Sequence, residues 1–171
     1  SAHHFDQLGH VTGELVVHGE RIAIDCIGMR DRTWGRRPEN RPRQAAYVMG
    51  AVDAANGFLA VTNIRPDGDM IAYGSLRRDG ETVNLEGGER HLERDPEHGW
   101  VTHVRLVGRD NQGRELNAVG TAISRLIINQ HTVIDINTLM RWDLDGLVAW
   151  GEDQDMWPVH RWARRRRERS A

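Results

Sequence analysis

The chain has 171 residues, of which 39% are hydrophobic and 28% charged, and this balance is typical of one soluble globular domain with a sizeable core. Its longest apolar runs are far too short to cross a bilayer, and no secretory hydrophobic segment opens the chain. The single cysteine, Cys26, excludes an internal disulfide framework and favours a reducing compartment, so we expect a cytoplasmic protein.

Charge is unevenly distributed along the chain. All 23 basic residues are arginine, against 25 acidic residues, and six of these arginines lie within residues 161–171. The rest of the chain is therefore acidic, which argues against nucleic-acid binding by the domain itself. The tail has three interpretations: a solvated terminus, a segment that docks on an acidic partner or on the acidic body, or a contact to RNA or a membrane surface.

Apolar residues recur mainly with a period of two, which indicates β-strands. Residues 11–28 predict two strands around a turn at 18–20, and residues 45–68 predict a strand, a turn at 55–57 and a second strand. Residues 69–95 predict a strand, an Asp79-Gly80 turn and one or two more strands. Turn residues at 110–113 and at Asp145-Gly146 separate the last four strands.

Nine or ten short strands with no long helical segment predict an all-β fold. We expect an antiparallel up-and-down barrel of about eight to ten strands, of the calycin or lipocalin type, over residues 1–158. Residues 159–171 are expected to form a basic tail or a short helix that caps one end of the barrel.

Several enzyme classes lack their motifs in this sequence. The serines have no nucleophile-elbow context, and neither a phosphate-binding loop nor a dinucleotide fingerprint is present. The nine histidines show no helical pair with zinc-protease spacing, so no metal is expected, although a site built from distant strands stays open. His103 shares a strand face with Val101 and Arg105 and either lines a lumen or faces water.

The stretch GMRDRTWGRR, residues 28–37, places four arginines around Asp31 and Trp34. Together with HHFDQLGHVTGELVVHG, residues 3–19, it resembles a block in the lipocalin-like superfamily of carotenoid 1,2-hydratases (hydroxyneurosporene synthases) and AttH-like proteins. The resemblance covers about 35 residues closely. It implies a calycin-like barrel that opens the second half of a tandem pair, with a cavity for an apolar ligand.

In the hydratases, a His and a Trp act with a carboxylate on a following strand to protonate an isoprenoid double bond. The resemblance places Trp34 at the Trp position and Arg32 at the His position. An arginine stays protonated near neutral pH and is no general acid. The motif therefore implies the fold and an apolar ligand more than it implies carotenoid hydration.

Candidate site residues follow from strand faces and charge. Asp31 between Arg30 and Arg32 suits a structural clamp better than a proton donor. A carboxyl group inside an apolar lumen has the raised pKa that a general acid needs. The catalytic candidates are Asp25, Asp31, Asp135 and Glu152, and the ligand-binding candidates are Arg32, Trp34, Tyr47, Tyr73, His103 and Trp142.

Two functional hypotheses result. In the first, a bacterial lipocalin-like enzyme binds a terpenoid, steroid or polyketide-like molecule and isomerises, hydrates or cyclises it by acid–base chemistry without a cofactor. In the second, the barrel holds such a ligand without catalysis or completes a partner barrel. The expected partners are the apolar ligand and either a second copy of the chain or a second lipocalin-like domain, with no nucleic acid and no membrane span.

Overall fold

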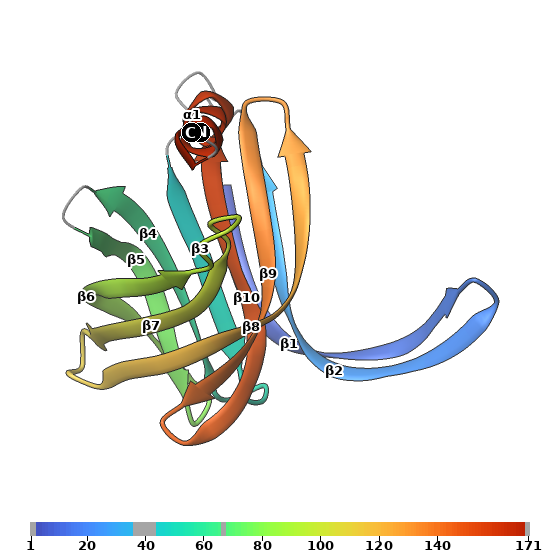
Figure 1. The fold of residues 1–171 in the computed structure, drawn as a ribbon. Coiled ribbons are helices and arrows are strands. Elements are labelled where there is room, and N and C mark those ends of the chain that lie inside the picture. The colour runs from blue at the N-terminus through green and yellow to red at the C-terminus, as the bar shows by residue number, and fades with distance from the viewer. Residues whose placement is uncertain (1–2, 36–43, 66–67, 170–171) are drawn as a thin grey trace.

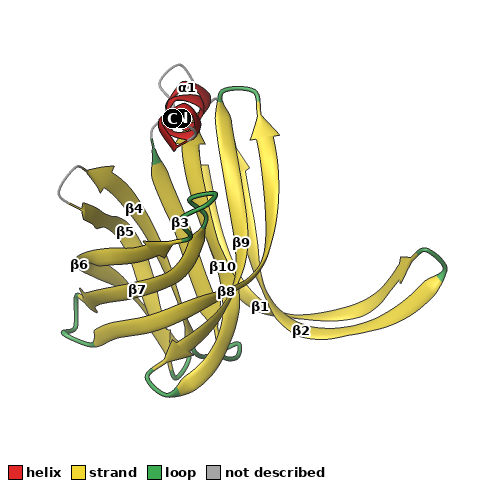
Figure 2. Cartoon of the chain, viewed as in Figure 1, coloured by secondary structure: helices red, strands yellow, loops and turns green. Residues whose placement is uncertain are grey.

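The computed structural model describes residues 3–35, 44–65 and 68–169. The elements follow one another as β1 (His3–Val17), β2 (Glu20–Trp34), β3 (Ala45–Ala51), β4 (Gly57–Arg65), β5 (Gly68–Arg78), β6 (Glu81–Arg94), β7 (Val101–Asp110), β8 (Glu115–Gln130), β9 (Val133–Leu144), β10 (Leu147–Pro158) and α1 (Val159–Arg169). Strands make up most of the chain, and a single short helix follows the last of them (Figures 1 and 2). Among the described residues, no helix is long and apolar enough to span a membrane.

Eight of the strands close into an antiparallel barrel, in the order β10-β3-β4-β5-β6-β7-β8-β9. From β3 to β9, each strand pairs with the next in sequence, and the pairing of β10 with β3 closes the barrel. The predicted fold class, an all-β antiparallel barrel with a short C-terminal helix, is confirmed.

The tight turns lie where the sequence predicts them. Asp79 and Gly80 have φ angles of 50° and 81°, and Asp145 and Gly146 have 52° and 85°. Positive φ at both central residues gives the turn twist that suits a two-residue hairpin. Residues 81–94 form one strand, β6, so the alternative of two strands in this segment is excluded.

Large side chains fill the middle of the barrel. Trp142 is fully buried and meets the ring of Phe58 edge-on at 5.2 Å. Two glycines make room for it, since a Cβ atom at Gly120 would lie 2.6 Å from the Trp142 ring and one at Gly50 would lie 2.9 Å from it. The interior near this ring is therefore a packed core.

The part of the barrel towards α1 holds buried charges. The guanidinium of Arg90 binds Asp153 through Nε at 2.9 Å and Nη2 at 2.6 Å, and it binds Asp69 through Nη1 at 2.5 Å. Arg94 donates to Asp155 at 2.6 Å. Buried charges are tolerated when they are paired in this way. These ion pairs connect β6 with β10 across the lumen.

The first two strands form a separate hairpin outside the barrel. Its base packs on the outer wall, where Met29 contacts the buried cluster of Tyr47, Leu59 and Val61. Its distal half projects away from the barrel (Figure 1). The strand register runs from His3 opposite Trp34 to Val17 opposite Glu20, so the predicted pair of strands is confirmed and extends further towards the N-terminus.

Candidate functional site

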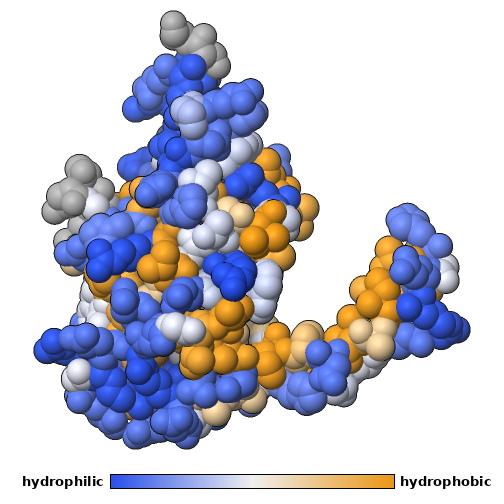
Figure 3. Space-filling model, turned by 60° about the horizontal axis from the view of Figure 1, so that its bottom comes forward, coloured by the Kyte–Doolittle hydropathy of each residue, from blue (hydrophilic) through white to orange (hydrophobic). Residues whose placement is uncertain are grey.

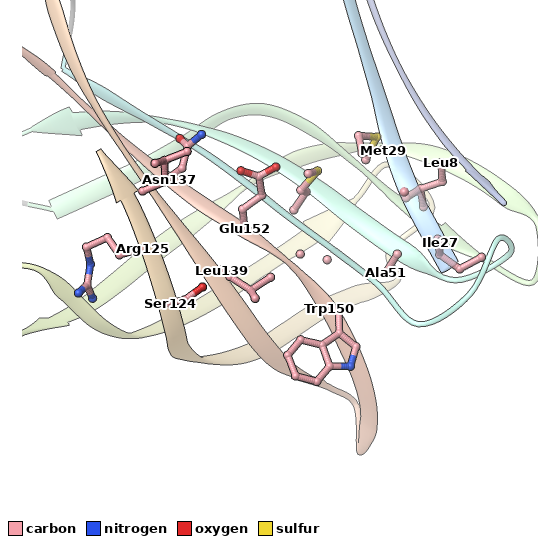
Figure 4. A pocket seen from close by; sticks show the side chains of 15 residues that line it. Leu8, Ile27, Met29, Ala51, Ser124, Arg125, Asn137, Leu139, Trp150 and Glu152 are labelled. Carbon is pink, nitrogen blue, oxygen red and sulfur yellow. The ribbon is translucent and has the colours of Figure 1, made fainter. Parts of the chain in front are cut away.

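A groove of about 510 Å³ lies on the outside of the barrel, beside the base of the β1–β2 hairpin (Figure 4). The hairpin forms one side, and the outer faces of β3, β10, β9 and β8 form the rest. Its apolar lining comprises Leu8, Ile27, Met29, Met49, Ala51, Leu126, Leu139 and Trp150. Its polar lining comprises Ser124, Arg125, Asn137 and Glu152.

Strand alternation explains why this outer wall is apolar. Thr138 and Asp153 are paired and fully buried, so their neighbours Leu139 and Glu152 face outward as the next pair. Met49 is the partner of Glu152 on β3 and faces outward beside it. The outer wall at the groove therefore combines apolar side chains such as Met49 and Leu139 with the carboxylate of Glu152.

A carboxyl pair lies at one end of the groove. Glu152 lines the groove and accepts from Gln154 Nε2 at 3.2 Å. Asp135 is 5% exposed, and Asn137 donates to its Oδ1 at 2.7 Å when the amide nitrogen faces it. Burial, and then the negative charges of Glu152 and Asp155, raise the pKa of Asp135 to about 6. An acid of this kind exchanges protons near neutral pH.

The predicted site residues of the hairpin are spread along it. Asp25 is on the projecting half, where its side chain is 79% exposed and binds His10 Nε2 at 2.5 Å, so it lies outside any barrel lumen. Trp34 is half exposed and stacks on His3 at 5.5 Å. Arg32, opposite Phe5 in β1, is exposed.

Asp31 lies directly opposite Asp6 across the hairpin. Two carboxylates directly opposite each other repel. The imidazole of His4 lies beside both, with Nε2 2.9 Å from Asp6 and Nδ1 3.6 Å from Asp31. Among the described residues, this imidazole is the ion-pair partner of Asp31, whereas the guanidinium of Arg30 lies over the Phe5 ring at 5.4 Å. Arg36 and Arg37, the other two arginines of this stretch, lie outside the described residues.

The ligand atoms of His4, Asp6 and Asp31 lie within 4.8 Å of one another, so these are the described side chains that could hold a metal ion. They are also joined by hydrogen bonds. Thr33 Oγ1 lies 2.7 Å from His4 Nδ1, and the hydroxyl of Tyr47 donates to Asp6. Burial, and then Asp6, raise the pKa of Tyr47, so the phenol stays protonated as a donor. This chain of contacts ties the hairpin base to β3.

The remaining predicted ligand-binding residues do not converge on the groove. Tyr73 is on β5 and 55% exposed, and His103 is on β7, 3.4 Å from Glu93 on β6. Trp142 belongs to the packed interior. Of the predicted set, the structure brings Asp135 close enough to Glu152 for their charges to interact, and it does the same for Tyr47 with Asp31 and Tyr73.

Sequence reasoning missed most of the apolar groove lining. Met49, Leu139 and Trp150 stand beside inward residues that are also apolar, at Val48, Met140 and Ala149. Apolar residues on both faces of neighbouring strands indicate that the outer wall of a barrel is covered or binds something. That signal was available in the sequence.

Comparison with known proteins gives one match. Residues 1–157 match the family described as a domain of unknown function, DUF7064. No curated protein and no solved structure matches the chain.

Proposed function

We propose that this chain, which belongs to the DUF7064 family, binds a small, largely apolar molecule in the groove on the outside of its barrel. The observation that carries the proposal is the groove itself, in which Leu139, Met49 and Trp150 surround the single carboxylate of Glu152. Small-molecule sites have this composition, with apolar walls and a few placed polar groups, and volumes of roughly 300–1,000 Å³. A terpenoid, a steroid or a polyketide-like molecule has the matching size and polarity.

The outer groove is a better site than the barrel interior. Trp142 and Phe58 occupy the middle of the lumen, and the ion pairs of Arg90 occupy the part towards α1. A ligand inside would have to displace this packing or break these pairs, and both cost several kcal/mol or more. The groove needs neither change, because it is already open.

Catalysis is the second candidate function, and the carboxyl pair favours it. Glu152 is the group that would touch the ligand, and Asp135 behind Asn137 is a neighbouring acid with a pKa of about 6. Protonation and deprotonation of an apolar substrate, as in isomerisation, hydration or cyclisation, need such a pair and no cofactor. In a simple binding protein, Glu152 would only orient a polar end of the ligand.

Binding of a neutral apolar fluorescent probe such as N-phenyl-1-naphthylamine tests the proposal. Leu139 is 42% exposed in the groove, so Leu139→Arg fills the groove with a charge at little cost to folding. We expect this variant to weaken probe binding at least about tenfold, because it replaces apolar contact with a charge that must be desolvated. His103→Arg adds the same side chain on β7, outside the groove lining, and is expected to bind like the wild type.

Equal probe affinity in Leu139→Arg and the wild type would refute the groove as the site. Native mass spectrometry of the protein from its own host then identifies the natural ligand by the mass that it adds. Glu152→Gln separates the two candidate functions, since a binding protein keeps its ligand unchanged in both forms, whereas an enzyme converts it only with Glu152.

A further inference from the structure

The projecting half of the β1–β2 hairpin, residues 10–27, is an arm with two different faces. On one face Val11 is opposite Cys26, Gly13 is opposite Ile24 and Leu15 is opposite Ile22. On the other face His10 binds Asp25 and Arg21 binds Glu14. The first face is thus mainly apolar and the second mainly polar, and most residues of the arm are exposed to solvent. A two-stranded hairpin is marginally stable alone in water, so an apolar face of this kind needs a partner surface.

The apolar face of the arm cannot be covered by its own barrel. At the hairpin base, Leu8 and its partner Met29 are the residues that turn towards the barrel. Side chains alternate along a strand, so Val11 and Leu15 belong to the opposite face, which turns away from the barrel. The arm also extends outward from the wall (Figure 1). The covering surface therefore lies outside the described barrel.

A second copy of the chain offers a suitable surface. The outer wall of β8–β10 carries exposed apolar side chains at Leu126, Leu139, Val148 and Trp150, with exposed fractions of 62%, 42%, 47% and 50%. We call these four residues the acceptor wall. Hydrophobic surface runs from the barrel onto the arm in the space-filling view (Figure 3). Each copy therefore presents one apolar arm and one apolar wall.

The buried area decides how two copies would meet. A two-stranded arm with about nine residues per strand is about 30 Å long and about 10 Å wide, so one face covers about 300 Å². Two arms packed against each other would bury about 600 Å² in total, which is the size of a crystal contact. Two arms that each lie on the other copy's wall would bury about 1,200 Å², which is the size of a specific interface.

We propose that two copies of this chain form a two-fold dimer by exchanging arms, the apolar face of each arm lying on the acceptor wall of the other copy. Two-fold symmetry makes the contact reciprocal, so both arms and both walls are covered at once. Leu126, Leu139 and Trp150 also line the groove of the proposed function, so the arriving arm closes the open side of that groove. The dimer itself does not depend on a ligand in the groove.

Sedimentation velocity over a range of protein concentrations tests the dimer with two matched variants. Leu15 and Val16 are neighbours with exposed fractions of 48% and 55%, on the apolar and the polar face respectively. We expect Leu15→Glu to raise the dimer dissociation constant at least about tenfold, because it places a charge in the contact. Val16→Glu is expected to dimerise like the wild type. A monomeric wild type at every concentration, or equal effects of the two variants, would overturn the proposal.

The single cysteine allows a direct test of the geometry. Cys26 is exposed on the apolar face of the arm. Under mild oxidation, Leu126→Cys should give disulfide-linked dimers between position 26 of one copy and position 126 of the other. Glu93→Cys, on the far wall with a side chain 77% exposed, should give none. A Cys26–Cys26 link in the wild type would instead show arms packed on each other and would refute the exchange.

Probe binding distinguishes a failure of the dimer proposal from a failure of the proposed ligand site. Leu15→Glu lies outside the groove, so its monomer should still bind N-phenyl-1-naphthylamine if the groove is a ligand site. Loss of dimers with retained probe binding supports both proposals. Wild-type dimers together with a Leu15→Glu monomer that does not bind the probe support the arm exchange and refute the groove.

Discussion

The fold raises the pKa of Asp135, which is the direction that a proton donor needs. It is nearly buried between Gln130, at 3.5 Å, and Asn137, and burial is the main cause of its pKa of about 6. An unperturbed aspartic acid has a pKa of about 3.9. Between these two pH values the folded chain holds a proton that the unfolded chain has lost. The contribution of Asp135 therefore lowers the free energy of unfolding progressively as the pH rises from 4 to 6.

Replacement of Asp135 by Asn should remove this cost. The shift of about two pKa units corresponds to roughly 3 kcal/mol at most. We expect Asp135→Asn to unfold at a higher urea concentration than the wild type at pH 7, with the difference shrinking as the pH falls to 4. Urea unfolding at several pH values measures it. A difference that stays constant over this range would show that Asp135 titrates as in an unfolded chain.

At the scale of elements, α1 is the cap of the barrel. Trp162 stacks on Trp100 at 5.4 Å and meets Trp157 at 5.7 Å, while Arg165 lies over the Trp157 ring at 4.9 Å. The arginine-rich segment is therefore a helix that docks on the barrel through tryptophans, and the predicted short helix is confirmed. Stacked aromatic pairs contribute about 0.5–1.5 kcal/mol beyond the area that they bury.

Removal of the Trp162 ring should loosen this cap. We expect Trp162→Ala to lower the free energy of unfolding by about 2–3 kcal/mol, because both the stacking and the burial of a large ring are lost. Arg167→Ala, at an exposed position of the same helix, should change it by less than about 0.5 kcal/mol. Thermal unfolding followed by circular dichroism compares the two. Similar effects of the two variants would mean that the helix does not stabilise the barrel through Trp162.

Elements that depend on local sequence were predictable, whereas their contacts were not. The Asp79-Gly80 and Asp145-Gly146 turns and the alternation of β2 follow from residue type and spacing alone. The position of the β1–β2 hairpin outside the barrel depends on which of its faces packs on β3 and β4, and alternation leaves both faces open. For the same reason Asp25 was expected in a lumen and lies on the arm, while Asp135 and Glu152 could be named but not paired.

At the scale of the whole molecule, the filled barrel distinguishes this chain from a hollow ligand carrier. Small residues on the lumen side of the wall allow one large ring to occupy the middle. Gly120 on β8 is the direct cross-strand partner of Trp142, and Gly50 lies on β3, two strands away on the other side, so small residues flank the ring on both sides. This packing favours the outer groove as the ligand site of the proposed function.

An added methyl group tests whether the interior is filled as described. A Cβ atom at Gly120 would lie 2.6 Å from the Trp142 ring and 2.9 Å from Met140, so Gly120→Ala forces the core to shift. We expect this change to lower the free energy of unfolding by about 1–3 kcal/mol, the usual cost of overpacking. Gly87→Ala is the control, since nothing lies within 4 Å of a Cβ atom there. Urea unfolding of both variants measures the difference. If Gly120→Ala were as stable as Gly87→Ala, the lumen would have free space beside Trp142, and the interior would again compete with the outer groove as the ligand site.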